Sequence, residues 1–272
     1  MKDYNKIKID EIISNGSVFE RKEIAERGYG LDKLINDKDW IVRMTVAKKG
    51  YGLDKLANDE DWAVRMTVAE QGYGLDKLIN DEHWTVRQAV AKQGYGLDKL
   101  INDVEWKVRK VVAEQGYGLD KLINDKHWRV RLTVAERGYG FDRLIDDEDW
   151  AVRMTVAEQG YGLDKLINDE DENVRQVVAE QGYGLDKLVN DESSDISELA
   201  NDLYNSKVYV VERNFGTYKG NLYLYVWEDK YEIKSGCYET TSLENWKEKC
   251  TEQLDKKTAN IYYNKMKETI GA

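Results

Sequence analysis

Residues 28–49 read Gly-Tyr-Gly-Leu-Asp-Lys-Leu-Ile-Asn-Asp-Lys-Asp-Trp-Ile-Val-Arg-Met-Thr-Val-Ala-Lys-Lys, and this stretch decides the fold because the chain repeats it. The Gly-Tyr-Gly triplet returns every 22 residues, beginning at Gly28, Gly50, Gly72, Gly94, Gly116, Gly138, Gly160 and Gly182. In the same frame arginine recurs from Arg43 to Arg175 and tryptophan from Trp40 to Trp150. A fixed period of this length is typical of solenoids, in which each unit stacks on the next.

Each unit predicts two short helices. Gly28 and Gly30 tolerate positive φ, so they can end one helix and turn the chain. The apolar residues between 31 and 35 suit a first helix that is either α or 3₁₀. Asp37 is expected to cap a second helix over 38–48. Because neither helix is stable alone at this length, the stacking of units has to stabilise both.

A helical wheel of the second helix separates a recurring face from a varying one. The recurring face carries Trp40, Val42, Arg43, Val46 and Ala47, and we expect it to pack. The tryptophan column is expected in the core or half-exposed, and an aromatic column that stacks on a ligand is the alternative. Positions 38, 41, 44, 45 and 48 form the opposite arc and are expected to face solvent or a partner. Position 39 varies and is expected to escape the core from the first turn.

Arginine on the packing face needs an anionic partner, because an unpaired buried cation is costly. For Arg43 the candidates are Asp37 and its equivalent in an adjacent unit. The sequence therefore predicts a structural ladder of ion pairs along the stack. Its members are Asp37, Arg43, Asp59, Arg65, Asp81, Arg87, Asp103, Arg109, Asp125, Arg131, Asp147 and Arg153.

The varying face supplies the candidate binding residues, namely Met44, Met66, Gln88, Lys107, Lys110, Arg129, Leu132 and Met154. Lys107, Lys110 and Arg129 come from two successive units and could converge within about 10 Å, one helix-to-helix spacing. Two interpretations stay open. The cations form a solvated patch balanced by Glu114 and Glu136, or they form a centre that binds an anion between apolar surfaces.

Composition limits the function classes. The 272 residues are 41% apolar and 34% charged, with 41 basic against 52 acidic side chains and a net charge of −11. This balance argues against general binding to DNA or RNA backbones. Residues 1–16 are too polar for a signal peptide, and no apolar run approaches the ~18 residues of a membrane span. Two cysteines suit a reducing compartment, so we expect a cytoplasmic protein.

No catalytic residue, metal or cofactor is expected. His83 and His127 lie 44 residues apart, two full units, so they cannot share a metal or a proton. Each occupies a position that carries an acidic side chain in most other units, which predicts a solvated helix start. Cys237 has no histidine near it in the sequence to activate its thiol, and Cys250 is expected to be buried.

The pattern Asp-x-x-x-x-Val-Arg-x-x-Val-Ala, as in 37–47 and 59–69, resembles the leucine-rich repeat variant family and the second helix of HEAT repeats. The resemblance covers residues 9–204. It implies a mainly α fold, a right-handed superhelical solenoid of 22-residue two-helix repeats, and a role in binding. The chain departs from the family in having Gly-Tyr-Gly where proline is usual. It also has no cysteine before Cys237, so no iron–sulfur cluster is inferred.

The expected domains are an N-terminal cap over 1–27, the solenoid over 28–204 and a small α+β C-terminal module over 205–272. The module is predicted to have strands at 207–212, 222–227 and 231–234, followed by helices that start near 243 and 259. Its Ser-Gly-Cys-Tyr segment, residues 235–238, resembles modules at the ends of phage and prophage repeat proteins.

These observations favour a non-catalytic binding or scaffold protein. The resemblance of the C-terminal segment implies, more specifically, a phage-type inhibitor or sequestering protein in the cytoplasm of a bacterial or phage-infected cell. A protein partner is expected first, and a small anionic ligand at the central basic patch second, with no membrane. Two alternatives remain at this point: a HEAT-like DNA glycosylase and a decoy that mimics DNA. Net negative charge over the repeats argues against the glycosylase, which needs a basic groove.

Overall fold

The structure is a computed structural model, and it describes residues 6–205, 207–215, 220–226, 231–235 and 238–240. The chain divides into two compact units, Met1–Leu144 and Ile145–Ala272, which are taken separately below. The boundaries expected at 27/28 and 204/205 stay predictions.

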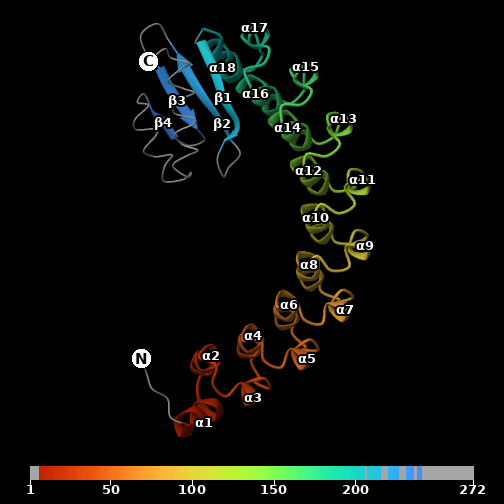
Figure 1. The fold of residues 1–272 in the computed structure, drawn as a ribbon, viewed down its shortest axis with the longest axis vertical. Coiled ribbons are helices and arrows are strands. Elements are labelled where there is room, and N and C mark those ends of the chain that lie inside the picture. The colour runs from red at the N-terminus through yellow and green to blue at the C-terminus, as the bar shows by residue number, and fades with distance from the viewer. Residues whose placement is uncertain (1–5, 206, 216–219, 227–230, 236–237, 241–272) are drawn as a thin grey trace. The chain divides into compact units, whose positions relative to one another are not determined.

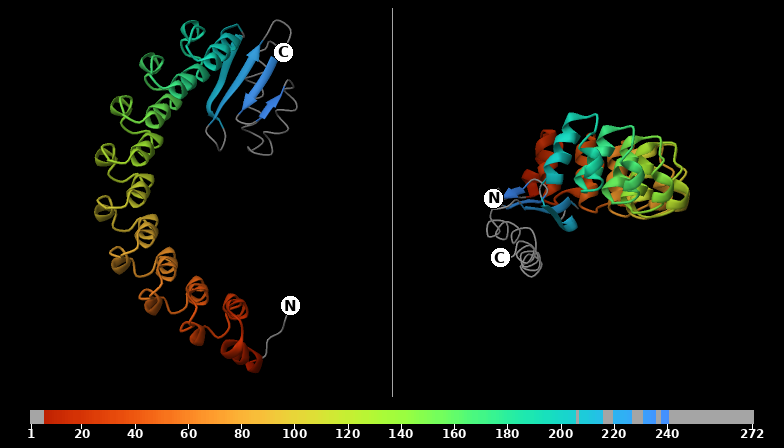
Figure 2. Two further views of the ribbon diagram at one scale, coloured as in Figure 1. Left: turned by 180° about the vertical axis from the view of Figure 1, so that it is seen from behind. Right: turned by 90° about the horizontal axis from the view of Figure 1, so that it is seen from above.

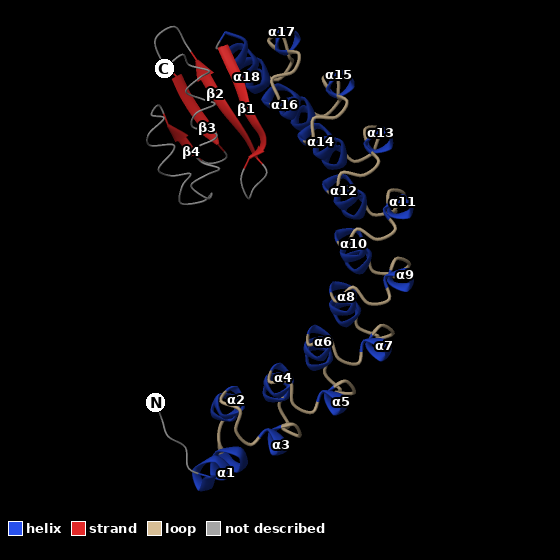
Figure 3. Cartoon of the chain, in the orientation of Figure 1, coloured by secondary structure: helices blue, strands red, loops and turns tan. Residues whose placement is uncertain are grey.

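Unit 1 is a regular alternation of short and longer helices (Figure 1). It begins with α1 (Lys6–Asn15) and α2 (Val18–Glu26). Four-residue helices then form one row: α3 (Leu31–Leu34), α5 (Leu53–Leu56), α7 (Leu75–Leu78), α9 (Leu97–Leu100), α11 (Leu119–Leu122) and α13 (Phe141–Leu144). Nine-residue helices form a second row: α4 (Trp40–Lys48), α6 (Trp62–Glu70), α8 (Trp84–Lys92), α10 (Trp106–Glu114) and α12 (Trp128–Glu136). Figure 3 shows the loops that link the two rows. The predicted helical repeat is confirmed.

Unit 2 continues the alternation and then changes to strands. Its helices are α14 (Trp150–Glu158), α15 (Leu163–Leu166), α16 (Glu172–Glu180), α17 (Leu185–Leu188) and α18 (Ser194–Asn205). Its strands are β1 (Lys207–Phe215), β2 (Gly220–Val226), β3 (Tyr231–Ser235) and β4 (Tyr238–Thr240). They form an antiparallel sheet in chain order, with Val208 opposite Tyr225 and Leu224 opposite Ile233 (Figure 2).

Strands β2 and β3 lie within two residues of the bounds expected for them, and the sheet departs further from the expectation at β1 and β4. Strand β1 runs to Phe215 rather than ending at Glu212, with its register shifted between Val210 and Glu212. Strand β4 was not expected from the sequence. The two helices predicted after residue 241 lie outside the described residues, as do Trp227, Cys237 and Cys250.

The core of each repeat comes from the recurring apolar positions. In the first full repeat of unit 1, Val42, Val46 and Ala47 are completely buried, and Leu34 of the short helix is almost so. Long helices contact their neighbours in sequence order, α2 with α4, α4 with α6, and so on to α10 with α12. Burial of these small faces on both sides supplies the stability that the short helices lack on their own.

The two glycines of each turn have different tasks. Gly28, at φ +80°, ends α2 by donating from its N–H to Ala25 O at 2.9 Å. The second glycine is left-handed as well, and it also lies against the preceding repeat. A Cβ at Gly52 would meet Ile35 Cδ1 at 2.1 Å. The first position of the turn therefore needs glycine for its conformation, and the third position needs it for space as well where isoleucine lies against it, as at Gly52.

The predicted helix cap is wrong by two residues. Helix α4 begins at Trp40, and its N-cap is Asp39, whose Oδ1 accepts from Ile41 N at 2.9 Å. Asp37 Oδ1 instead accepts from Asp39 N at 2.9 Å, in the turn before the helix. Both carboxylate oxygens of Asp37 also accept hydrogen bonds from Arg21 of the preceding repeat. The variable position 39 is therefore the capping position.

The expected exposure of position 45 is also wrong. Thr45 is only 4% exposed, whereas Trp40 is 40% exposed. A long helix in unit 1 contacts a long helix on each side as well as its short helices, so the buried arc is wider than the recurring one. The solvent side carries positions 40, 41, 44 and 48. The tryptophan column thus lies on the exposed face, beside the varying positions 41 and 44.

Candidate interaction surface

The exposed face of unit 1 carries a row of side chains that we call the tryptophan strip. It consists of the tryptophan position of each long helix and the half-buried or exposed side chains one and four residues after it. From α4 to α12 these are Trp40, Ile41, Met44, Trp62, Met66, Trp84, Thr85, Gln88, Trp106, Lys107, Lys110, Trp128, Arg129 and Leu132. All of the candidate binding residues except Met154 therefore belong to one surface of unit 1.

Histidine rings stack against two of the tryptophans. The Trp62 and His83 ring centroids lie 4.4 Å apart with an interplanar angle of 13°, and those of Trp106 and His127 lie 4.1 Å apart at 12°. Each histidine comes from the capping position of the next long helix, so the stacks join α6 to α8 and α10 to α12. The histidines thus pack against the tryptophans of the strip and are not simply solvated helix starts. Sequence reasoning missed these pairs.

Two cations lie over the tryptophan rings. Lys107 Nζ is 4.2 Å from the centroid of the Trp84 ring and 5.9 Å from that of Trp106. Arg129 Cζ is 5.3 Å from the Trp106 centroid and 4.4 Å from that of Trp128. Each cation therefore lies between two successive tryptophans, and both reach the same indole. Contacts of this kind contribute about 0.5–1 kcal/mol each at exposed sites.

Lys110 differs from the other two cations. Its ammonium pairs with Glu114 one turn later, so its charge is compensated within α10. Among the residues that the structure describes, no carboxylate oxygen lies within 4.0 Å of the Lys107 ammonium or the Arg129 guanidinium. The structure therefore brings two of the three predicted cations to one indole and ties the third to a carboxylate.

The environment of His127 favours its neutral form. Burial lowers the pKa of His127 below its usual 6.5, and the positive charge of Arg129 acts in the same direction. Its Nδ1 accepts from Arg129 N at 3.3 Å, which caps α12.

The remaining candidate binding residues are neutral. Met44, Met66 and Leu132 are half-buried, and Gln88 Nε2 donates to Lys107 O at 3.4 Å. Met154 lies in α14 of unit 2, where it is half-buried beside the half-exposed Trp150.

The ladder residues form bidentate ion pairs between neighbouring repeats. Arg43 Nε donates to Asp59 Oδ2 at 2.7 Å, Nη2 donates to Asp59 Oδ1 at 2.9 Å, and Nη1 donates to Asp37 O at 2.7 Å. Of the two partners that the sequence left open, the next repeat supplies the carboxylate and the arginine's own repeat the carbonyl. The same pairing joins Arg21 to Asp37, Arg65 to Asp81, Arg87 to Asp103 and Arg109 to Asp125 in unit 1, and Arg153 to Asp169 and Arg175 to Asp191 in unit 2.

Arg131 and Asp147 belong to different units. In unit 1 Arg131 Nη1 donates to Asp125 O at 2.8 Å, and in unit 2 Asp147 Oδ1 accepts from Asp149 N at 2.9 Å. Arg21, Asp169, Arg175 and Asp191 extend the ladder beyond the predicted set. The 22-residue period could have identified these residues, because Arg21 and Arg175 each lie 22 residues from a predicted member of the ladder.

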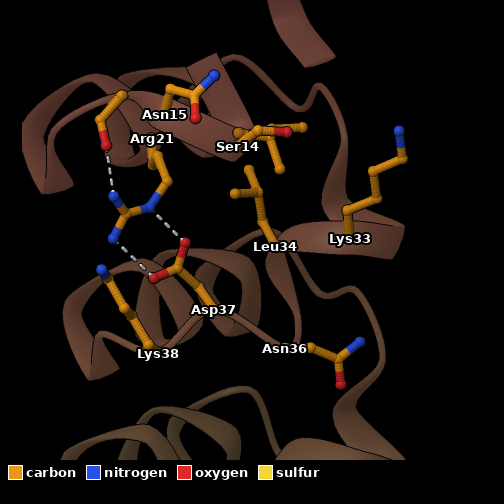
Figure 4. Close-up of a pocket in the computed structure, with 10 residues that line it drawn as sticks. Ser14, Asn15, Arg21, Lys33, Leu34, Asn36, Asp37 and Lys38 are labelled. Carbon is orange, nitrogen blue, oxygen red and sulfur yellow. Dashed lines mark hydrogen bonds and ion pairs between the residues drawn. The ribbon is translucent and has the colours of Figure 1, made fainter. Parts of the chain in front are cut away.

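The first rung of the ladder lies beside a surface hollow of about 370 Å³ (Figure 4). It is lined by the end of α1, including Ser14 and Asn15, and by Lys33, Asn36 and Lys38. Arg21 donates to both carboxylate oxygens of Asp37 and to Gly16 O at 2.6 Å. The Arg21–Asp37 pair at this hollow thus joins two repeats, and we assign the hollow to the ladder.

Within the described part of the chain, no group of three or more histidine, cysteine, aspartate or glutamate side chains is placed to hold a metal ion. A search of the same residues finds no helix with the length and apolar character needed to cross a membrane.

Comparison with models of known protein families gives no match, and no curated protein matches the sequence. The resemblance to leucine-rich repeat variant and HEAT units therefore rests on the repeated motif and on the helical repeat that the structure contains.

Proposed function

We propose that this chain is a non-catalytic binding protein that holds a protein partner on the tryptophan strip. One observation carries the proposal. Tryptophan and methionine recur on the solvent side of the repeats, outside the packed core, and the cations Lys107 and Arg129 lie among them. The core is formed by other positions, such as Val42, Val46 and Ala47. Tryptophan, methionine and arginine are enriched where proteins contact one another.

Variation along the strip supports a specific partner. Positions 41 and 44 of the frame carry Ile41 and Met44 in α4, but Lys107 and Lys110 in α10. The buried positions of the same helices hardly change. A surface that differs from repeat to repeat on a constant scaffold gives a partner one preferred position along the array.

We extend the proposal to the finer features that the sequence suggests. The repeats form a right-handed superhelix, and the strands together with the residues after 240 form a small α+β module. The partner is a bacterial protein, and the chain acts in the cytoplasm as a phage-type inhibitor or sequestering protein. The support is the motif resemblance of residues 37–47 and of Ser-Gly-Cys-Tyr at 235–238.

Affinity capture from bacterial lysate tests the proposal. The variant Lys107→Glu/Lys110→Glu/Arg129→Glu is expected to lose a captured protein that the natural chain retains. The matched control Lys77→Glu/Lys99→Glu/Arg143→Glu makes the same charge change on the exposed row of four-residue helices and is expected to retain it. Capture that survives the strip variant contradicts the proposal. Binding of duplex DNA at physiological salt would instead favour the glycosylase alternative.

A further inference from the structure

We propose that the tryptophan strip binds an extended acidic peptide segment, with carboxylates paired to Lys107 and Arg129 and an apolar side chain on the Trp62–Met66 surface. This inference rests on the proposed function and names the chemistry of its partner.

The positive charges of Lys107 and Arg129 indicate where the acidic residues of the partner bind. Lys107 and Arg129 hold their charges over indole rings and not against carboxylates, so both remain available to a partner's anions. Lys110 is already compensated by Glu114. The cationic part of the strip is therefore confined to one side chain from α10 and one from α12. A partner gains two ion pairs there, one at the half-buried Lys107 and one at the exposed Arg129.

Spacing sets the register of the segment. Neighbouring packed helices lie about 8–10 Å apart. A polyproline-II segment has three residues per turn and rises about 3.1 Å per residue, so every third side chain returns to the same face after about 9 Å. One turn of such a segment therefore matches one repeat of the strip. Acidic residues at positions i and i+3 would meet the two cations.

The strip changes character from α12 toward α6. After the cationic helices α12 and α10, α8 presents Thr85 and Gln88, and α6 presents Trp62 and Met66. If one turn of the peptide spans one repeat, every third residue of the peptide meets a new helix of the strip. From α12 to α6 these residues are acidic, acidic, polar and apolar, and the peptide can run in either chain direction. The apolar residue lies six positions from the nearer acidic one.

The same distribution disfavours nucleic acid as the occupant. A nucleic acid carries a phosphate at every nucleotide, and its affinity grows with the number of cations that it meets. Beyond Lys107 the strip offers it neutral and apolar side chains, with Asp61 at the cap of α6. A short acidic segment that continues with uncharged residues fits this surface better.

Fluorescence anisotropy with dye-labelled peptides tests the inference. The probes are Glu-Pro-Pro-Glu-Pro-Pro-Gln-Pro-Pro-Leu and its reversed sequence, because proline spacers favour the required conformation. One of the two is expected to bind the full chain about tenfold or more tightly than its analogue with glutamine in place of both glutamates. The variant Lys107→Glu/Arg129→Glu should lose this preference, and the matched control Lys77→Glu/Arg143→Glu should keep it.

Charge reversal guards against a variant that fails to fold. A peptide with lysine in place of both glutamates should bind Lys107→Glu/Arg129→Glu and not the natural chain. The inference is overturned if neither acidic peptide binds, if the glutamine analogue binds equally well, or if the control variant loses binding to the same extent. Tighter binding of a single-stranded oligothymidylate that depends on the two cations also overturns it. Cation-dependent capture of a protein whose binding site lacks acidic residues would overturn the inference and leave the proposed function standing.

Discussion

Within a unit, a ladder arginine bonds two neighbouring repeats at once. Arg109 donates to both carboxylate oxygens of Asp125, at 2.5 and 2.8 Å, and to Asp103 O of its own repeat at 2.7 Å. Both side chains of the pair are more than nine-tenths buried. At the residue scale the ladder therefore behaves as a set of buried ion pairs, which are costly to break from one side and cheap to replace as a pair.

Substitution of this pair tests that behaviour. Arg109→Met leaves the Asp125 carboxylate buried without its main partner and is expected to destabilise the fold by about 3–5 kcal/mol. In Arg109→Met/Asp125→Asn the amide oxygen can still accept from His127 N, so the double variant should be more stable than Arg109→Met. Urea unfolding followed by circular dichroism gives the comparison. A double variant less stable than Arg109→Met would contradict it.

At the scale of the element, the turn glycines provide matched positions. Gly52 and Gly74 have nearly the same φ, +59° and +62°, but differ in what lies beside them. A Cβ at Gly52 would meet Ile35 Cδ1 at 2.1 Å, whereas at Gly74 it would meet Ala57 Cβ at 3.4 Å. The difference arises because residue 57 is alanine where most other repeats have isoleucine.

Alanine at the two positions should therefore have unequal effects. Gly74→Ala is expected to cost only the left-handed conformation, about 1–2 kcal/mol. Gly52→Ala must also displace Ile35 in a packed core, which typically adds about 1–3 kcal/mol. Thermal unfolding of both variants measures the difference, and Gly50→Ala, with open space around its Cβ, is the conformational control. Equal losses at Gly52 and Gly74 would show that the close approach is unimportant.

Element boundaries also show what the sequence could predict. The 22-residue period and the Gly-Tyr-Gly turns predicted the two-helix repeat, because helices and turns this short depend on residues that are close together in the chain. The cap could not be chosen locally, since both Asp37 and Asp39 suit it. Asp37 is held instead by Asp39 N and by Arg21, which lies 16 residues earlier in another repeat. Position 45 and its equivalents carry threonine, alanine or valine. Because the residue type varies, this position was expected on the solvent face, although it is buried.

The candidate site was predictable to a similar extent. Lys107, Lys110 and Arg129 could be grouped from the frame, and the i to i+4 spacing already pointed to Glu114 as a partner of Lys110. The stacking of His83 and His127 on tryptophans could have been found by comparing position 39 with the tryptophan of the preceding repeat. Whether a given cation has a carboxylate partner depends on side-chain geometry, which could not be predicted from the sequence.

At the scale of the whole molecule, protonation links the ladder to stability in both units. Burial alone would raise the pKa of Asp125 in unit 1, but hydrogen bonds from Arg109 and from His127 N hold it below its usual value of 3.8. In unit 2 the hydrogen bond from Arg175 lowers the pKa of Asp191. A lowered folded pKa gives stability that is present above the unfolded value and is lost as pH falls through the folded one.

The acid response of the chain should therefore have two stages. His127 has its pKa lowered from 6.5, so the folded state binds its proton less readily than the unfolded state, and unit 1 is expected to lose stability first as pH falls below about 6.5. Both units should lose stability at lower pH, below about 4, as Asp125 in unit 1 and Asp191 in unit 2 are protonated. Thermal unfolding between neutral and acidic pH measures both stages. His127→Gln should remove the upper stage and leave the lower one, whereas Arg175→Met/Asp191→Asn should weaken only the lower one. Stability that rises on acidification through either range would contradict the assignment, because it would require the folded state to bind these protons more tightly than the unfolded chain does.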